Sequence, residues 1–183
     1  AETLRHLWQQ FEEDPLRAVL LADTSTFLSA RHFIAAVGQS IIPFVASVDG
    51  EPAGISWLYN IAMAPPKMTP ISAFTAGYVL PQFRNAHLRR ECNKAYISLV
   101  HTYGIEHLWA EVRTDNLAAH YALRASGFKK AALLPSWKRY KGQWHDMALY
   151  HLLILTPFES TTPSLKIVTD CQLKQTAPLK ESL

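Results

Sequence analysis

Apolar side chains recur at helical spacing near the start of the chain. Thr3 can cap a helix whose apolar positions follow an i, i+3, i+4, i+7 pattern, at Leu4, Leu7, Trp8 and Phe11. Asp14-Pro15 is expected to end this helix, because proline disfavours helix at the residue before it. A second helix is predicted from Thr24 or Ser25 to a stop at Gly38, with an apolar side made by Phe27, Leu28, Ile34 and Val37. The pattern predicts a helical hairpin.

The next apolar runs have the character of strands. Residues 41–48 and 52–61 are rich in β-branched and aromatic side chains and flank Asp49-Gly50, a strong signal for a β-hairpin. Residues 62–70 contain three prolines and are predicted to form a loop. Residues 71–80 are predicted to form a third strand, which ends at Pro81.

The second half of the chain alternates between helical and extended patterns. The predicted elements are a helix over 86–103, a strand over 107–113, a helix that Asp115 can cap and that runs through Ser126, and two strands around a turn at Lys141-Gly142. Such alternation requires crossover helices on a mixed sheet. The predicted fold class is therefore α/β or α+β.

Composition and length indicate one globular domain. The chain has 183 residues, of which 49% are hydrophobic and 18% are charged, and it is long enough to bury a core. Residues 1–155 are assigned to this domain. Residues 156–183 are rich in Thr, Ser, Pro and Lys and have too few apolar side chains for a core of their own. We expect this polar C-terminal tail to dock on its own domain or on a partner, so that it could mediate a homo- or hetero-oligomer.

Charge and cysteine content argue against several kinds of partner. The net charge is +3, and the densest basic cluster, Lys138, Arg139 and Lys141, is interrupted by Tyr140, so we interpret it as a solvated turn that does not favour nucleic acid as a partner. Two cysteines cannot build a disulfide framework, and the eight histidines lack the spacing of a metal site. The nearly apolar stretch over 147–155 is shorter than the roughly 20 residues of a membrane helix. These features favour a cytoplasmic protein without a metal or a membrane segment.

Three groups of residues together resemble the GNAT superfamily of N-acetyltransferases. Asn116, Ala119, Gly127 and Phe128 are similar to the family's N-x-x-A and Gly-Phe signature, residues 141–155 to its terminal hairpin, and Val79 and Pro81 to the strand end before its CoA loop. The resemblance covers residues 74–155, about half of the chain. Each group alone also fits an ordinary helix stop or core aromatic in any fold. The order of the three groups implies a GNAT-like, mixed and mostly antiparallel sheet with flanking helices, and we leave open whether the family's first strand is present.

The resemblance implies acetyl-CoA as the cosubstrate, bound at a loop that reads Q/R-x-x-G-x-G/A in the family. The corresponding residues are Arg84, Asn85, Ala86, His87, Leu88 and Arg89. Arg84 fits the first position, whereas His87 and Arg89 replace small residues and would crowd a diphosphate, which the arginines would still attract. By the same resemblance, the N–H groups of Val79 and Leu80 would orient and polarise the thioester carbonyl, and Asn116 would assist CoA or the acceptor.

Candidates for proton transfer are sparse. The family's tyrosine, four residues before the Gly of Gly-Phe, corresponds to Leu123, which cannot donate a proton. Tyr121 is the nearest phenol, but it is rotated by about 200° on a helix. Glu111 could act as a general base or lie in solvent, because it alternates with apolar neighbours along its strand. His87, His120 and His145 are further conceivable proton carriers.

Two functions from different classes remain open, and a third possibility, a small nucleic-acid-binding domain, rests only on the isoelectric point near 8.9. The first is an N-acyltransferase that moves an acetyl group from acetyl-CoA to a small-molecule or peptide amine. The second is a catalytically inactive GNAT-fold component of a larger assembly, such as a phage particle, which would place the protein in a virion. The altered loop, the missing tyrosine and the polar tail favour the second function, and the ordered resemblance favours the first.

Overall fold

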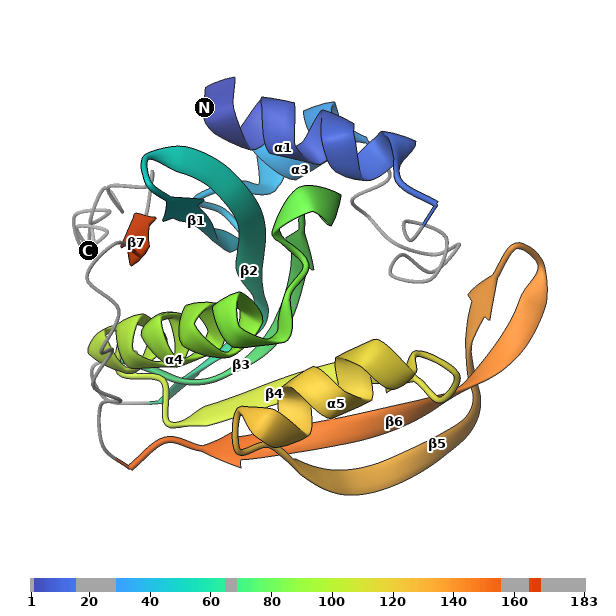
Figure 1. The fold of residues 1–183 in the computed structure, drawn as a ribbon. Helices are drawn as coiled ribbons and strands as arrows, with labels where there is room; N and C mark the ends of the chain where they lie inside the picture. The colour runs from blue at the N-terminus through green and yellow to red at the C-terminus, as the bar shows by residue number, and fades with distance from the viewer. Residues whose placement is uncertain (1, 16–28, 65–68, 156–164, 169–183) are drawn as a thin grey trace, which may run out of the picture.

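The computed structural model describes residues 2–15, 29–64, 69–155 and 165–168. Its strands form one sheet in the order β5-β6-β4-β3-β2-β1-β7 (Figure 1). The strands are β1 (Ile42–Val48), β2 (Glu51–Ala64), β3 (Thr69–Val79), β4 (His107–Arg113), β5 (Lys129–Tyr140), β6 (Gln143–Leu153) and β7 (Leu165–Val168). The helices are α1 (Glu2–Glu13), α3 (Ala30–Ala36), α4 (Ala86–Thr102) and α5 (Leu117–Ala125), with a short 3-10 helix, η1 (Pro81–Phe83).

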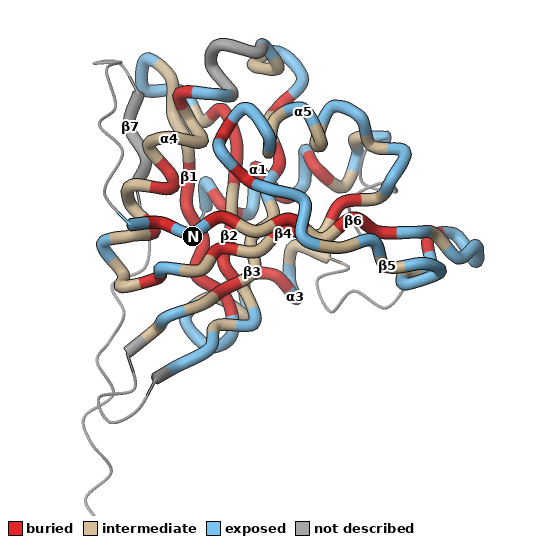
Figure 2. Tube along the Cα trace, turned by 90° about the horizontal axis from the view of Figure 1, so that it is seen from below, coloured by how far each residue is buried: buried red, intermediate tan, exposed pale blue. Residues whose placement is uncertain are grey.

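Helices pack on both faces of the sheet. On one face, α4 and α5 cover a core that includes Leu58, Leu108 and Tyr150. On the other face, α1 and α3 cover β1, β2 and β3 through a second core, in which the ring of Trp8 stacks on Phe33 with centroids 4.1 Å apart. Figure 1 shows α1 and α3 together, apart from α4 and α5. Buried residues concentrate along the strands, between the helices that cover the two faces of the sheet (Figure 2).

The predicted elements correspond well to the observed ones, except that residues 62–64 and 69–70 of the predicted loop belong to β2 and β3. The first helix, the hairpin around Asp49-Gly50 and the strand over 107–113 are confirmed, and the mixed, mostly antiparallel sheet confirms the predicted fold class. One N-cap was wrong: Asn116 caps α5 by accepting from the N–H of Ala119, whereas Asp115 accepts from Arg113. An Asn side chain serves as well as Asp at this position, so the pattern alone could not choose between neighbours.

The second helix differs from its predicted start. The helix α3 begins at Ala30 and is capped by Ser29, whose hydroxyl accepts from the N–H of His32. Its buried side chain is Phe33, while Ile34 and Val37 are only partly buried. The predicted start at Thr24 or Ser25, with Phe27 and Leu28, lies outside the described residues.

One edge of the sheet is completed from the C-terminal segment. The strand β7 pairs antiparallel with β1, from Val45 opposite Val168 to Val48 opposite Leu165. The remainder of the predicted tail, 156–164 and 169–183, lies outside the described residues. No strand precedes β1 in residues 2–15 or 29–41, so within these ranges the family's first strand has no counterpart.

The strands β3 and β4 run parallel but stay paired over a short length. Their register joins Ser72, Ala73 and Phe74 with His107, Leu108 and Trp109. Beyond these pairs β3 continues to Val79 and β4 to Arg113, and the two strands diverge (Figure 1). The diverging end of β3 leads through η1 into α4, and the candidate site lies at this end of β3.

Candidate functional site

The carboxyl-terminal half of β3 directs backbone groups toward β4. The N–H of Leu80 donates to the carbonyl of Ala53 at 2.9 Å, so residue 80 points its N–H toward β2. In an antiparallel pair the direction alternates, and the register with β2 is regular from Gly54 opposite Val79 onward. The N–H and C=O groups of Val79 and Gly77 therefore point toward β4, beyond the residues at which β3 and β4 pair. Of the two predicted N–H donors, Val79 faces this region and Leu80 is bonded within the sheet.

The amino end of α4 follows directly after this strand. The helix starts at Ala86, and the first N–H groups of an α-helix have no partner within the helix, which makes its end attractive to anions. Asn85 is exposed and donates its N–H to the carbonyl of Phe83. Ala86, His87, Leu88 and Arg89 form the first turn of α4, and their side chains lie outside the described part of the structure.

Arg84 points to the opposite face from α4. Its guanidinium forms an ion pair with Asp14, at the end of α1, and lies 5.4 Å from the ring centroid of Tyr78. Its Nε donates to the carbonyl of Val79 at 2.9 Å. Tyr78 also donates its hydroxyl to Asp14 at 2.9 Å, and burial together with this hydrogen bond raises the pKa of Tyr78 to about 12. Arg84 thus fastens α1 to the β3–α4 connection.

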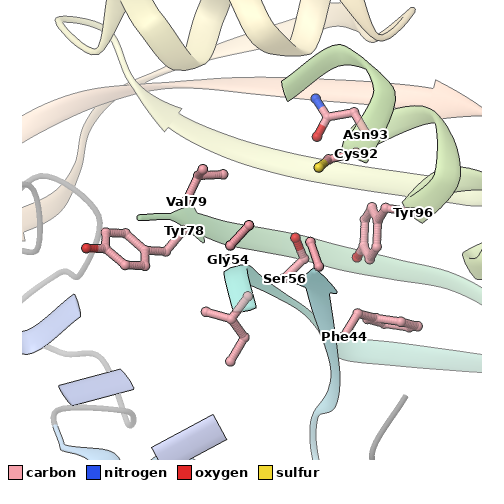
Figure 3. Close-up of a pocket in the computed structure, with 11 residues that line it drawn as sticks. Phe44, Gly54, Ser56, Tyr78, Val79, Cys92, Asn93 and Tyr96 are labelled. Carbon is pink, nitrogen blue, oxygen red and sulfur yellow. The ribbon is translucent and has the colours of Figure 1, made fainter. Parts of the chain in front are cut away.

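A small cavity lies between α4 and the sheet (Figure 3). Cys92, Asn93 and Tyr96 line it from the helix, and Ala46, Gly54 and Ser56 are among the small residues that line it from the strands. Figure 3 shows Tyr78 pointing away from these helix residues. The cavity has a volume of about 30 Å³, enough for one or two water molecules. Ligand pockets usually measure hundreds of Å³, so an acetyl-pantetheine arm would not fit in this cavity.

The thiol of Cys92 in this cavity is not a reactive nucleophile. Burial, together with the nearby charge of Glu91, raises the pKa of Cys92 to about 11. A thiol reacts as its thiolate, so little of the reactive form exists near neutral pH. The cavity therefore offers no covalent chemistry through Cys92.

Glu111 lies on the face of β4 that is turned away from α4 and α5. Its neighbours Leu108, Ala110 and Val112 point into the core on the other side. The carboxylate accepts from the indole Nε1 of Trp137 at 3.0 Å and forms an ion pair with Lys138. Its side chain is only 12% exposed, so of the two options left open by the sequence Glu111 is not simply solvated.

Tyr59 of β2 shares this side of the molecule with Glu111. Burial raises the pKa of the Tyr59 phenol well above its usual range, and the negative charge of Glu111 adds to the shift. Tyr59 packs against Phe74 with ring centroids 5.7 Å apart, and Phe74 packs against Trp109 at 6.4 Å. An aromatic surface thus runs from β2 across β3 to β4 beside Glu111. The proximity of Tyr59 and Phe74 to Glu111 depends on the pairing of three strands, so no local sequence pattern signals it.

The helix α5 does not bring its predicted residues into one group. Tyr121 is 68% exposed, whereas Leu123 packs against the core. Asn116 is occupied as the N-cap of the helix. The structure therefore separates Tyr121 from Glu111 and from the backbone of Val79.

His120 is held by hydrogen bonds at both ring nitrogens. The distance from Nδ1 to the hydroxyl of Tyr150 is 2.8 Å, and Nε2 lies 3.0 Å from the carbonyl of Arg113. A carbonyl only accepts, so Nε2 carries the proton, and in the neutral ring the Tyr150 hydroxyl donates to Nδ1. His145 lies against Tyr140 on the β5–β6 hairpin. These contacts give both histidines structural partners.

The described residues contain neither a cluster of metal-binding side chains nor a helix that could span a membrane. No group of three or more His, Cys, Asp or Glu side chains in these residues is arranged to hold a metal ion. None of the described helices is long and apolar enough to cross a membrane.

Comparison with solved structures identifies similar folds. RimJ from Mycobacterium smegmatis in complex with CoA-disulfide is 17% identical, with a TM-score of 0.66 over 83% of this chain and 78% of that chain. Spermidine N-acetyltransferase from Vibrio cholerae in complex with CoA and spermine is 14% identical, with a TM-score of 0.67 over 83% and 90% of the two chains. The microcin C7 self-immunity acetyltransferase MccE, in complex with acetyl-CoA and AMP, is 16% identical, with a TM-score of 0.63 over 84% and 88%. No family model and no curated protein matches the sequence. The structural likeness establishes the fold of this chain.

Proposed function

We propose that this chain, which has the GNAT fold, is an N-acyltransferase that moves an acetyl group from acetyl-CoA to an amine. The observation that carries the proposal is the divergence of β3 from β4, into which the N–H of Val79 points. An N–H donor fixed in a strand can polarise a thioester carbonyl without reorganising during the reaction. The similar structures whose names include CoA or acetyl-CoA support the same cosubstrate.

In this proposal acetyl-CoA lies between β3 and β4, and its diphosphate lies at the first turn of α4. The N–H groups of residues 86–89 would hold the anion, and Asn85 and Asn116 lie at neighbouring helix starts. Arg84 reaches the diphosphate only if its guanidinium leaves Asp14. The cavity between α4 and the sheet, which Val79 also lines, is too small at about 30 Å³ to enclose the pantetheine arm by itself.

The acceptor amine approaches from the face that carries Tyr59 and Glu111. Its nitrogen attacks the thioester carbonyl carbon, the C–N bond forms, the C–S bond breaks, and the CoA thiolate leaves with the bonding electrons. The amine then loses one proton. Glu111 is the proposed base, and it must exchange its contact with Lys138 for a contact with the amine or with a bridging water. Tyr121 has no role in this scheme, because its ring lies in solvent.

The acceptor is proposed to be a small-molecule or peptide amine, and the reaction is proposed to occur in the cytoplasm. Spermine appears in the name of one similar structure, and two other similar proteins are named as ribosomal-protein alanine acetyltransferases. These names supply two probe classes, a polyamine and a peptide with a free α-amine. Both classes present a nitrogen that can be neutral at mildly alkaline pH.

The test measures thiol release from acetyl-CoA with spermine and with an alanine-initiated peptide as acceptors. Replacing Val79 by Pro removes the proposed N–H donor and costs no hydrogen bond to β2, whereas Val79→Ile keeps the donor. We expect amine-dependent thiol release that falls about 100-fold in Val79→Pro and stays within a few-fold in Val79→Ile. If the two variants are equally active and circular dichroism shows both folded, the N–H of Val79 does not polarise the thioester carbonyl.

The alternative, a GNAT-fold component of a larger assembly without catalysis, is favoured by one group of observations. Arg84 and Glu111 are both engaged in ion pairs, and a leucine occupies the position of the family's tyrosine. A titration calorimetry experiment separates the two functions. Absence of heat at millimolar CoA would favour the assembly component, in which the segment after Leu155 is proposed to mediate contacts.

A further inference from the structure

The hairpin formed by β5 and the start of β6 concentrates the positive charge of the chain. Residues 129–146, called the arm below, contain five Lys or Arg and one Asp, a net charge of +4. The whole chain has a net charge of +3, so the other 165 residues sum to −1. The arm extends past the end of α5 and ends in the turn at Lys141-Gly142 (Figure 1). It is mostly exposed (Figure 2).

Both of the strongly exposed tryptophans lie on the arm. Trp137 is 53% exposed and Trp144 is 63% exposed, whereas Trp8 and Trp57 are core residues and Trp109 is partly buried. Trp144 lies directly opposite Arg139, which is also exposed. Exposed indole rings contribute little to the core, so their clustering beside cationic side chains indicates a binding surface.

The arm is braced rather than loosely attached. Glu111 accepts from the indole of Trp137 and pairs with Lys138. The N–H of Ser136 donates to Asp146 at 2.8 Å, across the two strands. Tyr140 is buried with Met147, and the guanidinium of Arg113 lies 5.0 Å from its ring centroid. A rigid support lowers the entropic cost of binding at the exposed rings.

We propose that the arm binds single-stranded nucleic acid. Flat exposed indoles offer stacking surfaces for bases, and neighbouring Arg and Lys side chains attract phosphates, which is the combination that single strands require. In the sequence the basic cluster resembled a solvated turn, because the exposure of Trp137 and Trp144 and the register that places Trp144 opposite Arg139 become apparent only in the folded hairpin. The proposal is independent of acetyl transfer.

Other anionic partners fit the arm less well. A membrane surface would favour apolar side chains at the tip, whereas the turn consists of Lys141 and Gly142. An acidic protein would match the charge but would not need two exposed indole rings on the same arm. The base faces of a single strand use both features.

The experiment titrates the full chain with a fluorescein-labelled oligouridine of 12 nucleotides, without acetyl-CoA, at several salt concentrations. Trp144→Ala removes one stacking ring and leaves the contacts of Glu111 in place, and Arg139→Gln removes one cation. Leu117→Ala, at an exposed apolar residue on α5, is the matched control. Intrinsic tryptophan fluorescence reports stacking directly.

We expect saturable binding with quenched tryptophan fluorescence, weakened about ten-fold in Trp144→Ala and unchanged in Leu117→Ala. Arg139→Gln should reduce the slope of log affinity against log salt by about 0.7. Absence of binding at low salt, or equal affinity of Trp144→Ala and the unsubstituted chain, would overturn the proposal. Binding to vesicles of anionic phospholipid or to polyglutamate, but not to the oligonucleotide, would overturn it equally.

Discussion

The ion pair between Asp14 and Arg84 joins the end of α1 to the β3–α4 connection, where the candidate site lies. The side chain of Asp14 is 5% exposed and accepts from both Tyr78 and Arg84. Asp14→Asn removes the charge that Arg84 faces, and unpairing one member of a partly buried ion pair costs about 2 kcal/mol. We expect the free energy of unfolding in urea to fall by this amount. Asp49→Asn, in an exposed turn where Asn adopts the same positive φ, is the control and should change little.

An equal loss in the two variants would show that the Asp14 contact contributes no more than any surface carboxylate. Asp14→Asn also bears on CoA binding, together with Arg84→Ala. If Arg84 must leave Asp14 to reach the diphosphate, Asp14→Asn should bind CoA more tightly and Arg84→Ala more weakly, measured by calorimetry.

Two glycines on neighbouring strands provide a matched pair for the packing of β2 on β3. A Cβ atom at Gly54 would lie 2.6 Å from the backbone carbonyl oxygen of Tyr78, which cannot move without shifting the strand. A Cβ atom at Gly77 would lie 2.8 Å from the hydroxyl of Ser56, which can rotate. We therefore expect Gly54→Ala to destabilise the fold by about 2 kcal/mol or more, and Gly77→Ala by less. Chemical denaturation of both variants tests the order, and a larger loss for Gly77→Ala would contradict it.

At the scale of elements, β7 protects the edge of β1. Four residues of the C-terminal segment pair with Val45, Ala46, Ser47 and Val48, and without them the edge would be open to other chains. Truncation after Leu155 removes β7 and should lower the free energy of unfolding by about 2–4 kcal/mol, since each backbone hydrogen bond lost between β7 and β1 contributes about 1 kcal/mol. It should also promote association, measured by light scattering. Truncation after Val168 keeps β7 and should behave like the full chain, and equal behaviour of the two truncations would contradict this assignment.

Local patterns predicted the elements well where one rule dominated. The strand over His107–Arg113 was predicted with its observed bounds because polar and apolar residues alternate there, and α4 was predicted from its apolar stripe. The start of α3 and the cap of α5 were less well determined, because several Ser, Thr, Asp and Asn residues compete for each cap. The GNAT fold followed from the order of short motifs rather than from any single motif.

The candidate site was less predictable than the fold. The pairing of Arg84 with Asp14 joins residues 70 positions apart, and no local pattern signals it. The engagement of Leu80 within the sheet, and the direction of Val79 away from it, depend on the register of β2 against β3. For Tyr121 the sequence already indicated a rotation away from the family's position, and its ring is exposed in the structure.

At the scale of the whole molecule, the binding surfaces lie on different parts of the fold. The divergence of β3 and β4 provides the proposed acetyl-CoA site, and the arm provides the proposed nucleic-acid surface. Glu111 connects them, because it faces Tyr59 and also holds Trp137 and Lys138. A ligand bound to the arm should therefore change how readily Glu111, the proposed base, leaves its contacts with Trp137 and Lys138.

The most direct test of the proposed activity is a crystal structure of the protein soaked with acetyl-CoA. We predict that the acetyl-pantetheine arm lies between β3 and β4, with its thioester carbonyl within hydrogen-bonding distance of the N–H of Val79 and its diphosphate at the first turn of α4. Crystals that diffract well but contain no CoA at millimolar concentration, or that hold it away from Val79, would contradict the proposal that this fold transfers acetyl groups.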